Sequence, residues 1–304
     1  MPGEPRMHDH AIAFTTPPGA PRQRRWLLSP PGRIAIFVAW LVGLMVMLRF
    51  GFLALGMGQG TPILQQNLAQ FVARALVPLA AYLILVKLVE RRALIELAPR
   101  SLLPQGLLGA LGGLLLFSAV VAVLWLVGSY HVSAFQPHAP WLGALLVVGL
   151  GAGIGEEIVF RGVLFRIVEE GLGTWWALGI SALLFGAIHA ANPGATLWSS
   201  AAIAIEAGLL FGMVYHVTRS LPVCMGLHAA WNFAQGTIYG IPVSGTAADG
   251  WLVSTRSGPD WLTGGAFGAE ASVVALALCT LGTTGLLVVA RRRGSIVPPV
   301  WRRR

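Results

Sequence analysis

Apolar residues fill the run Trp141-Leu-Gly-Ala-Leu-Leu-Val-Val-Gly-Leu-Gly-Ala-Gly-Ile-Gly155, which continues without a turn signal into Glu156, Glu157 and Arg161. Ionisable groups in an apolar segment of membrane length are rare and usually functional. Glu157 and Arg161 stand at positions i and i+4 with the acid first, the favourable order for an ion pair on one helix face. Glu156 projects about 100° away on the same helix. We therefore expect Arg161 to hold Glu157 and to leave Glu156 free for chemistry. The alternative is that both acids are solvated at a membrane–water boundary.

The composition identifies the class of protein. Of 304 residues, 56% are hydrophobic and 11% are charged, and the mean hydropathy is +0.72. Soluble domains carry roughly 25% charged residues, so the chain is predicted to be an integral membrane protein. The formal net charge is +9, but the basic residues cluster at the ends of apolar runs. That placement fits orientation in a lipid bilayer rather than nucleic-acid binding.

The hydropathy pattern predicts an all-α, polytopic membrane helix bundle. Each apolar segment is near the ~20 residues that a bilayer requires. Residues 1–32 are predicted to be a disordered, basic and Pro-rich arm, 33–293 the transmembrane domain, and 294–304 a basic tail. About eight transmembrane helices are expected, at 34–56, 68–89, 105–128, 141–166, 174–191, 196–217, 221–240 and 270–290.

The loops alternate in basic charge, which orients the bundle. Basic residues precede the first span, surround the second connection and follow the fourth, sixth and eighth spans, whereas the intervening loops carry a single one, Arg256. The positive-inside rule then places both termini in the cytoplasm. The protein is expected in the plasma or inner membrane. The loop 241–269 is expected on the outer face, and 90–103 is expected as a short amphipathic helix on the inner surface.

A histidine on the fifth span is predicted to face the free acid. His189 lies about as many residues after the turn at Gly171–Gly173 as Glu156 lies before it, so the two come to similar heights on antiparallel helices. A Glu–His pair in a shielded site can hold and polarise a water, with the carboxylate as general base. The alternative is that His189 is a satisfied core residue.

A second polar pair lies on the seventh span. His228 and Asn232 stand at i and i+4 and share one helix face. Adjacent donors suit an oxyanion hole, and the alternative is hydrogen bonding between helices. Glu206 is a supporting candidate that could pair with His228 or with Arg74, and Arg74 could equally bind a substrate carboxylate.

Three ordered motifs carry a family resemblance. Glu156-Glu157-x-x-x-Arg161, Phe185-x-x-x-His189 and His228-x-x-x-Asn232, with the run Leu-Leu-Phe-Gly-Met-Val-Tyr-His-Val-Thr-Arg-Ser-Leu before His228, resemble the CAAX prenyl protease and bacteriocin-processing (CPBP) family of intramembrane endopeptidases. The resemblance covers roughly 87–238, with its motif core at about 141–238.

The resemblance implies a protease with roles for these residues. Glu156 would activate water with help from His189, while His228 and Asn232 would stabilise the oxyanion. Glu157, Arg161 and Phe185 would support them. The family is often called a metalloprotease and has also been described as a glutamate protease. We expect either no cofactor or a zinc ion held by Glu156, His189 and His228.

The predicted function is hydrolysis of a peptide bond in a membrane-anchored substrate, of the prenylated CAAX type or a leader peptide. Two other classes remain open. A proton-coupled carrier also uses intramembrane acids and histidines, but the chain lacks paired, Gly/Pro-interrupted spans in matching halves. A non-catalytic membrane partner could keep the polar groups for packing.

Overall fold

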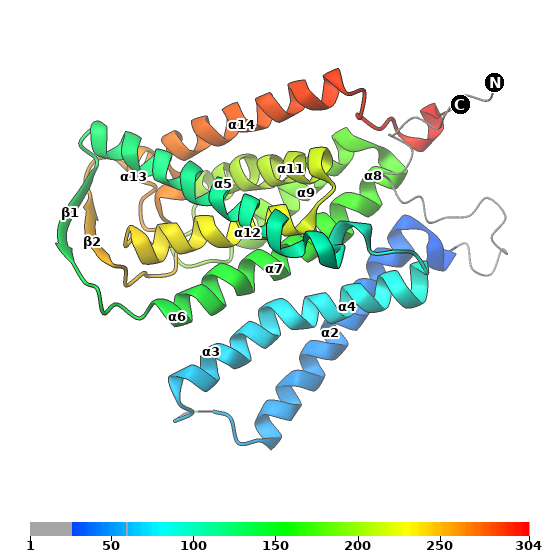
Figure 1. The fold of residues 1–304 in the computed structure, drawn as a ribbon, viewed down its shortest axis with the longest axis horizontal. Coiled ribbons are helices and arrows are strands. Elements are labelled where there is room, and N and C mark those ends of the chain that lie inside the picture. Colours follow the sequence, from blue (N-terminus) through cyan, green and yellow to red (C-terminus); the bar gives the residue numbers. More distant parts are fainter. Residues whose placement is uncertain (1–25, 59, 304) are drawn as a thin grey trace.

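A computed structural model describes residues 26–58 and 60–303 as a bundle of helices with one small sheet (Figure 1). Within these residues, six helices are long and apolar enough to cross a membrane, judged by length and composition. The chain is therefore an integral, multi-pass membrane protein. These helices are α2 (Pro30–Ala54), α5 (Pro99–Leu126), α14 (Val273–Arg292) and the composite helices Ile63–Glu90, Trp141–Leu172 and Leu197–Thr218.

The composite helices alternate α-helical and π-helical segments. Their named parts are α3 (Ile63–Phe71), α4 (Val77–Ile84), α6 (Trp141–Gly143), α7 (Ala152–Glu157), α8 (Arg166–Leu172), α10 (Leu197–Ile203) and α11 (Leu210–Thr218). α7 ends in the acid pair and lies between π-helical segments Ala144–Gly151 and Ile158–Phe165. Such segments are frequent at functional sites.

The other two predicted spans are also helical but shorter. α9 (Thr174–His189) is an apolar helix below spanning length. The run 221–238 comprises α12 (Leu221–Phe233) and the π-helical Ala234–Ile238, and it is not among the six long apolar helices. Helices thus occupy every predicted segment of the described chain, while a count of eight spanning helices stays a prediction.

Both predicted tails contain ordered structure where the chain is described. α2 begins at Pro30 because Ser29 caps it, accepting a hydrogen bond from the Gly32 amide, and proline suits the first helical turn. Residues 30–32 therefore belong to the first helix, and residues 26–28 form a helical turn before it. The remaining part of the predicted arm, 1–25, lies outside the described residues. Beyond α14, Val297 exchanges two hydrogen bonds with Thr174 at the start of α9, so this segment packs on the bundle.

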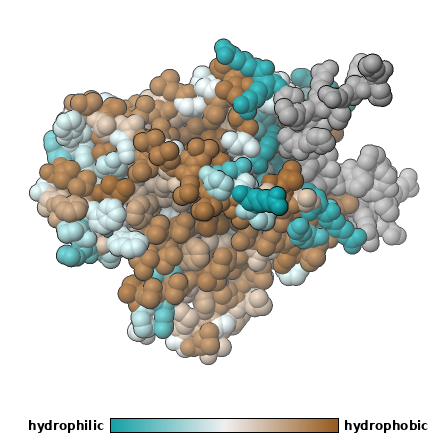
Figure 2. Space-filling model, viewed as in Figure 1, coloured by the Kyte–Doolittle hydropathy of each residue, from teal (hydrophilic) through white to brown (hydrophobic). Residues whose placement is uncertain are grey.

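The outer surface carries the hydrophobic residues expected of a bilayer protein. Figure 2 shows hydrophobic residues across the middle of one face, with hydrophilic ones gathered mainly at its two ends. The exposed residues of α2 include Trp40, Met47 and Phe50, and those of α5 include Leu107 and Leu111. Because these side chains have no protein partner on their outer side, lipid is their natural environment.

A two-stranded antiparallel sheet closes one end of the bundle, at the left of Figure 1. Strand β1 (Tyr130–Phe135) follows α5, and strand β2 (Leu252–Arg256) lies inside the predicted loop 241–269. Tyr130 pairs with Arg256 and Phe135 with Leu252. The loop also contains α13 (Asp260–Thr263) and leads to the 3₁₀ turn Ala269–Ala271. The all-α prediction is confirmed for the bundle and missed this sheet.

The segment 90–103 is not the amphipathic surface helix that its charges suggested. It contains a 3₁₀ turn, Ile95–Leu97, and then the start of α5. Glu90 is buried and accepts from three guanidinium groups: Arg33 at 3.0 Å, Arg92 at 2.8 Å and Arg166 at 2.8 Å. Glu90, Arg92 and Glu96 therefore pair inside the protein, whereas Arg91 and Arg100 are exposed.

Glycines bring the helices around the acid pair into backbone contact. A Cβ on Gly155 would overlap the backbone carbonyl of Arg74, and one on Gly153 would lie 2.8 Å from the amide nitrogen of Ala229 in α12. Small residues let helices approach this closely in membranes. Gly153 and Gly155 thus allow α7 to pack closely against both the helix of Arg74 and α12.

Candidate active site

A polar cavity of about 380 Å³ lies where α7, α9, α12 and the helix of Arg74 meet. Glu156, His189, His228 and Asn232 all line it, as the sequence motifs predict. Its other polar lining residues are Gln70, Arg74, Asn192, Ser244 and Thr246. The cavity therefore gathers groups from all three motifs around one space.

Glu156 and His189 face each other across this cavity. Glu156 Oε2 lies 3.8 Å from His189 Nε2, and the side chains are 29% and 7% exposed respectively. His189 Nδ1 lies 2.7 Å from the carbonyl oxygen of Phe185. Because a carbonyl only accepts, Nδ1 donates to it, and Nε2 is the ring nitrogen that faces Glu156. In the neutral form of this tautomer Nε2 carries a lone pair, so the two side chains can accept hydrogen bonds from a single water molecule.

Glu157 is fully buried and points to a different set of partners. Its Oε1 accepts from Arg161 Nη1 at 3.0 Å, as predicted, and from His228 Nδ1 at 2.8 Å. Arg161 Nη2 also donates to the carbonyl of Ala207 at 2.8 Å. The link to His228 was not foreseen, because helical spacing within one segment carries no information about a contact between α7 and α12. Glu157 is thereby committed to structure and Glu156 is not.

His228 and Asn232 line the cavity from α12 on one face, as predicted. The Asn232 Nδ2 group donates one hydrogen to the carbonyl of Val148 at 3.0 Å. An amide carries two such hydrogens, so one remains for a ligand. The Nε2 of His228 is the ring nitrogen that Glu157 does not engage. Each residue thus keeps one polar group for a ligand.

Phe185 positions the groups around it. Its ring centroid lies 4.5 Å from that of His189 and 4.9 Å from that of Phe160, while its backbone carbonyl fixes His189 Nδ1. The guanidinium of Arg161 lies 5.0 Å from the Phe185 ring centroid, within cation–π range. This side chain therefore contacts both the Glu157–Arg161 pair and the proposed water-holding histidine.

Glu206 does not take the partners suggested for it. It is buried in a π-helical turn between α10 and α11, where it packs toward α9 and α14. In the described part of the chain, no hydrogen bond or ion pair joins Glu206 to His228 or Arg74. That predicted pairing is wrong because Glu157, on the neighbouring helix, occupies His228 Nδ1.

The predicted zinc ligands do not assemble into a metal site. Across residues 26–58 and 60–303, no group of three His, Cys, Asp or Glu residues is arranged to hold a metal ion. The Nδ1 atoms of His189 and His228 are engaged by Phe185 and Glu157, and each ring keeps its Nε2 atom for a further ligand.

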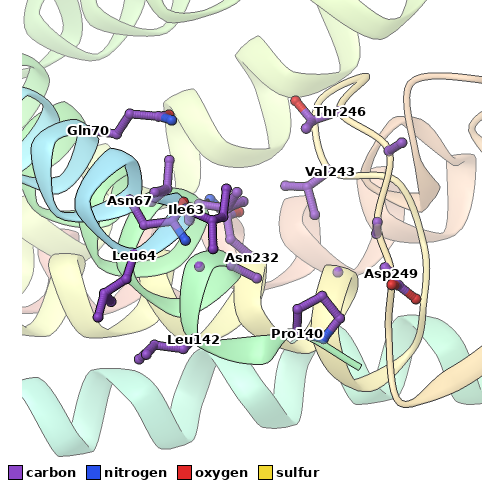
Figure 3. A pocket seen from close by; sticks show the side chains of 17 residues that line it. Ile63, Leu64, Asn67, Gln70, Pro140, Leu142, Asn232, Val243, Thr246 and Asp249 are labelled. Atoms are coloured by element: carbon purple, nitrogen blue, oxygen red, sulfur yellow. The ribbon is translucent and has the colours of Figure 1, made fainter. Parts of the chain in front are cut away.

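A second cavity of about 480 Å³ adjoins the polar one (Figure 3). It is mostly apolar and lies between α3, the start of the Trp141–Leu172 helix and the segment Val243–Asp249. The residues that line both cavities are Gln70, Val147, Val148, Asn232, Val243 and Thr246. An elongated ligand can therefore extend from the apolar space to the Glu156–His189 pair.

The matched segment of the chain contains all three motifs. Residues 137–234 match the Rce1-like family model. Its description is type II CAAX prenyl endopeptidase Rce1-like, and the match spans roughly a third of the chain. This Rce1-like segment holds all three motifs, so the resemblance predicted from them is confirmed there. The flanking parts of the predicted range, 87–136 and 235–238, lie outside the match.

The Rce1-like segment supplies Glu156, His189, His228 and Asn232, but it does not supply every residue that lines the cavity. Gln70 and Arg74 come from before it, and Val243, Ser244 and Thr246 come from after it. No curated protein sequence matches the chain. The residues that line the cavity from outside the Rce1-like segment are therefore described from the structure alone.

Proposed function

We propose that the protein is an intramembrane endopeptidase that hydrolyses a peptide bond of a membrane-anchored substrate. One observation carries the proposal: the Glu156 carboxylate and His189 Nε2 face each other at 3.8 Å in a polar cavity. The match of residues 137–234 to the Rce1-like endopeptidases supports the same reaction class. The adjoining apolar cavity gives such a substrate room beside the polar groups.

The residues have distinct roles in this mechanism. A water that donates to Glu156 and His189 loses a proton to the Glu156 carboxylate as its oxygen attacks the peptide carbonyl carbon. The developing oxyanion accepts from the second Asn232 amide hydrogen and from His228 Nε2. His228 donates from Nε2 when both ring nitrogens are protonated, a form that the Glu157 carboxylate at Nδ1 stabilises. Protonated Glu156 then gives its proton to the leaving amine.

The test compares variants of the two facing residues, Glu156 and His189, in purified protein. Membrane-spanning, lipidated and leader-type peptides are incubated with the wild type, Glu156→Gln and His189→Ala, and products are identified by mass spectrometry. Loss of the general base lowers the rate roughly 10²–10⁴-fold. Glu156 is partly exposed and holds no buried cation in the described structure, so Glu156→Gln should unfold at the same temperature as the wild type.

Two further readouts separate the alternatives. Elemental analysis of the active wild type reports bound metal, and stoichiometric zinc whose chelation abolishes cleavage would replace the metal-free mechanism. Full activity in both Glu156→Gln and His189→Ala would reject the proposal. Gradient-dependent uptake by the wild type with no cleaved product would instead indicate a carrier.

A further inference from the structure

Arg74 is a cation placed deep in a membrane helix. It lies in the 28-residue run Ile63–Glu90, roughly 16 Å from the start of that helix at about 1.5 Å per residue. Arginine at such a depth is costly and usually faces a cavity, where it pairs with another group. Arg74 does line the polar cavity of the candidate active site. The position therefore calls for an anionic partner.

The described protein supplies no such partner. The structure shows no hydrogen bond or ion pair to the Arg74 side chain within residues 26–58 and 60–303, although Glu156 lines the same cavity. By contrast, the buried arginines Arg33, Arg161 and Arg166 are all paired with acids. An unmatched guanidinium beside a catalytic carboxylate points to a negative charge that arrives with the ligand.

The backbone at Arg74 packs closely against the helix that carries Glu156. Gly155, next to Glu156, packs on the Arg74 carbonyl, and a Cβ on Gly151 would lie 3.3 Å from Arg74 Cβ and 3.5 Å from Arg74 Cδ. The aliphatic stem of Arg74 thus lies along Gly151 in the helix that carries Glu156. This helix crossing fixes the backbone positions of Arg74 and Glu156 relative to each other.

Polar residues extend from Arg74 along one face of its helix. Asn67, Gln70 and Arg74 stand at i, i+3 and i+7, which places them on the same side. Figure 3 shows Asn67 and Gln70 at the adjoining cavity, and Gln70 also lines the polar one. A chain of peptide groups can hydrogen-bond along this face while its end or a side chain reaches Arg74.

We propose that Arg74 is a specificity-determining residue that binds a carboxylate of the peptide substrate. This inference rests on the proposed endopeptidase function and adds the chemistry that the substrate must carry. A guanidinium pairs with a carboxylate through two parallel hydrogen bonds. The carboxylate comes from the end of the substrate chain or from an acidic side chain. Phospholipid head groups lie at the ends of a spanning helix, away from Arg74.

The experiment measures kcat/KM for three matched peptides that share one cleavage site. One has a free carboxyl end and an acidic side chain, the second has an amidated end, and the third has the acid replaced by its amide. They are compared in the wild type, Arg74→Gln, Arg74→Lys and the control Arg49→Gln. Arg49 is also an exposed arginine of a membrane helix, α2, but it does not line either cavity.

The wild type should cleave the full peptide roughly 10–100-fold more efficiently than one of the two amides, mainly through a lower KM, as expected for a charged hydrogen bond. Whichever amide loses this advantage identifies the source of the carboxylate. Arg74→Gln should cleave all three peptides equally, Arg74→Lys should keep part of the preference, and Arg49→Gln should keep all of it.

Other outcomes overturn the inference in distinguishable ways. If the wild type cleaves all three peptides equally well, Arg74 does not select a carboxylate and the proposed function stands. Retention of the full preference by Arg74→Gln has the same meaning. If the wild type cleaves no peptide, the proposed function fails and the inference falls with it. Should Arg74→Gln fail to insert, the wild-type comparison and Arg74→Lys decide the question.

Discussion

Glu157 Oε1 lies 2.8 Å from His228 Nδ1 and 3.0 Å from Arg161 Nη1, so the second acid of the pair joins α7 to α12. Glu156, its neighbour in sequence, faces His189 in the cavity instead. Two adjacent glutamates therefore belong to different units, one that fixes helices and one that is open to a ligand. Substitutions at the two positions should separate stability from catalysis.

Glu157→Gln should destabilise the protein where Glu156→Gln does not. The change leaves the buried Arg161 guanidinium without a counter-charge, and breaking a buried pair in this way costs about 3–5 kcal/mol. Thermal unfolding in detergent should show a clear drop in midpoint for Glu157→Gln and none for Glu156→Gln. Equal midpoints for the two variants would contradict the assignment of Glu157 to a structural role.

Asn232→Ala should reduce turnover while leaving substrate affinity nearly intact. Removal of one oxyanion donor lowers kcat roughly 10²–10³-fold. The comparison variant is Asn67→Ala, which removes an amide that lines only the adjoining cavity and should change KM more than kcat. Steady-state kinetics on one peptide checks both. A KM effect alone at Asn232 would place that side chain in binding rather than in oxyanion stabilisation.

Gly155→Ala should disturb the site through the backbone. The added Cβ would overlap the Arg74 carbonyl, so α7 and the helix of Arg74 would have to move apart. We expect a loss of stability of about 1–3 kcal/mol and a fall in activity. Gly179→Ala in α9 is the control, because nothing lies within 4 Å of a Cβ there. That change should be neutral or slightly stabilising, since alanine favours helix.

Glu270 should make stability depend on pH. It precedes α14, outside the spanning helices, and burial raises the pKa of its carboxyl from 4.5 to about 7. The folded state therefore holds this proton more tightly than the unfolded state. Its contribution is fully present below about pH 4.5 and is lost as the pH rises through about 7, a change of about 3 kcal/mol.

The pH test compares the wild type with Glu270→Gln. Glu270 Oε1 accepts from the amide and hydroxyl of Ser244, and a glutamine oxygen can accept both bonds. Unfolding midpoints at pH 5 and pH 8 should differ more in the wild type than in the variant. Ser244 lines the polar cavity and has a positive φ of 46°. Because Glu270 holds this residue by hydrogen bonds, activity should follow the same pH trend as stability. An unchanged pH profile in Glu270→Gln would refute this account.

Local spacing explains which parts of the site were predictable. The Glu157–Arg161 pair follows from i,i+4 geometry, and the Glu156–His189 approach follows from counting residues to a shared turn. The bundle itself follows from hydropathy. Each of these depends on one segment or on two segments joined by a short turn, so sequence alone contains the needed distances.

The contacts that were missed join segments far apart in the chain. Glu157 reaches His228 across two packed helices, and Glu90 collects arginines from α2 and from the start of α8. Neither the rotation of one helix against another nor the choice of partner among several arginines is encoded in spacing. The strand Leu252–Arg256 was missed because its stability depends on pairing with Tyr130–Phe135.

The small sheet has a consequence for how the protein is made. Its two strands enclose the whole Rce1-like segment in sequence, because Tyr130–Phe135 precedes residue 137 and Leu252–Arg256 follows residue 234. During synthesis the first strand cannot pair until every helix of that segment, and then the second strand, has left the ribosome. Protection of its backbone amides from exchange would thus time the last step of assembly, after the helices of the candidate site are already in the membrane.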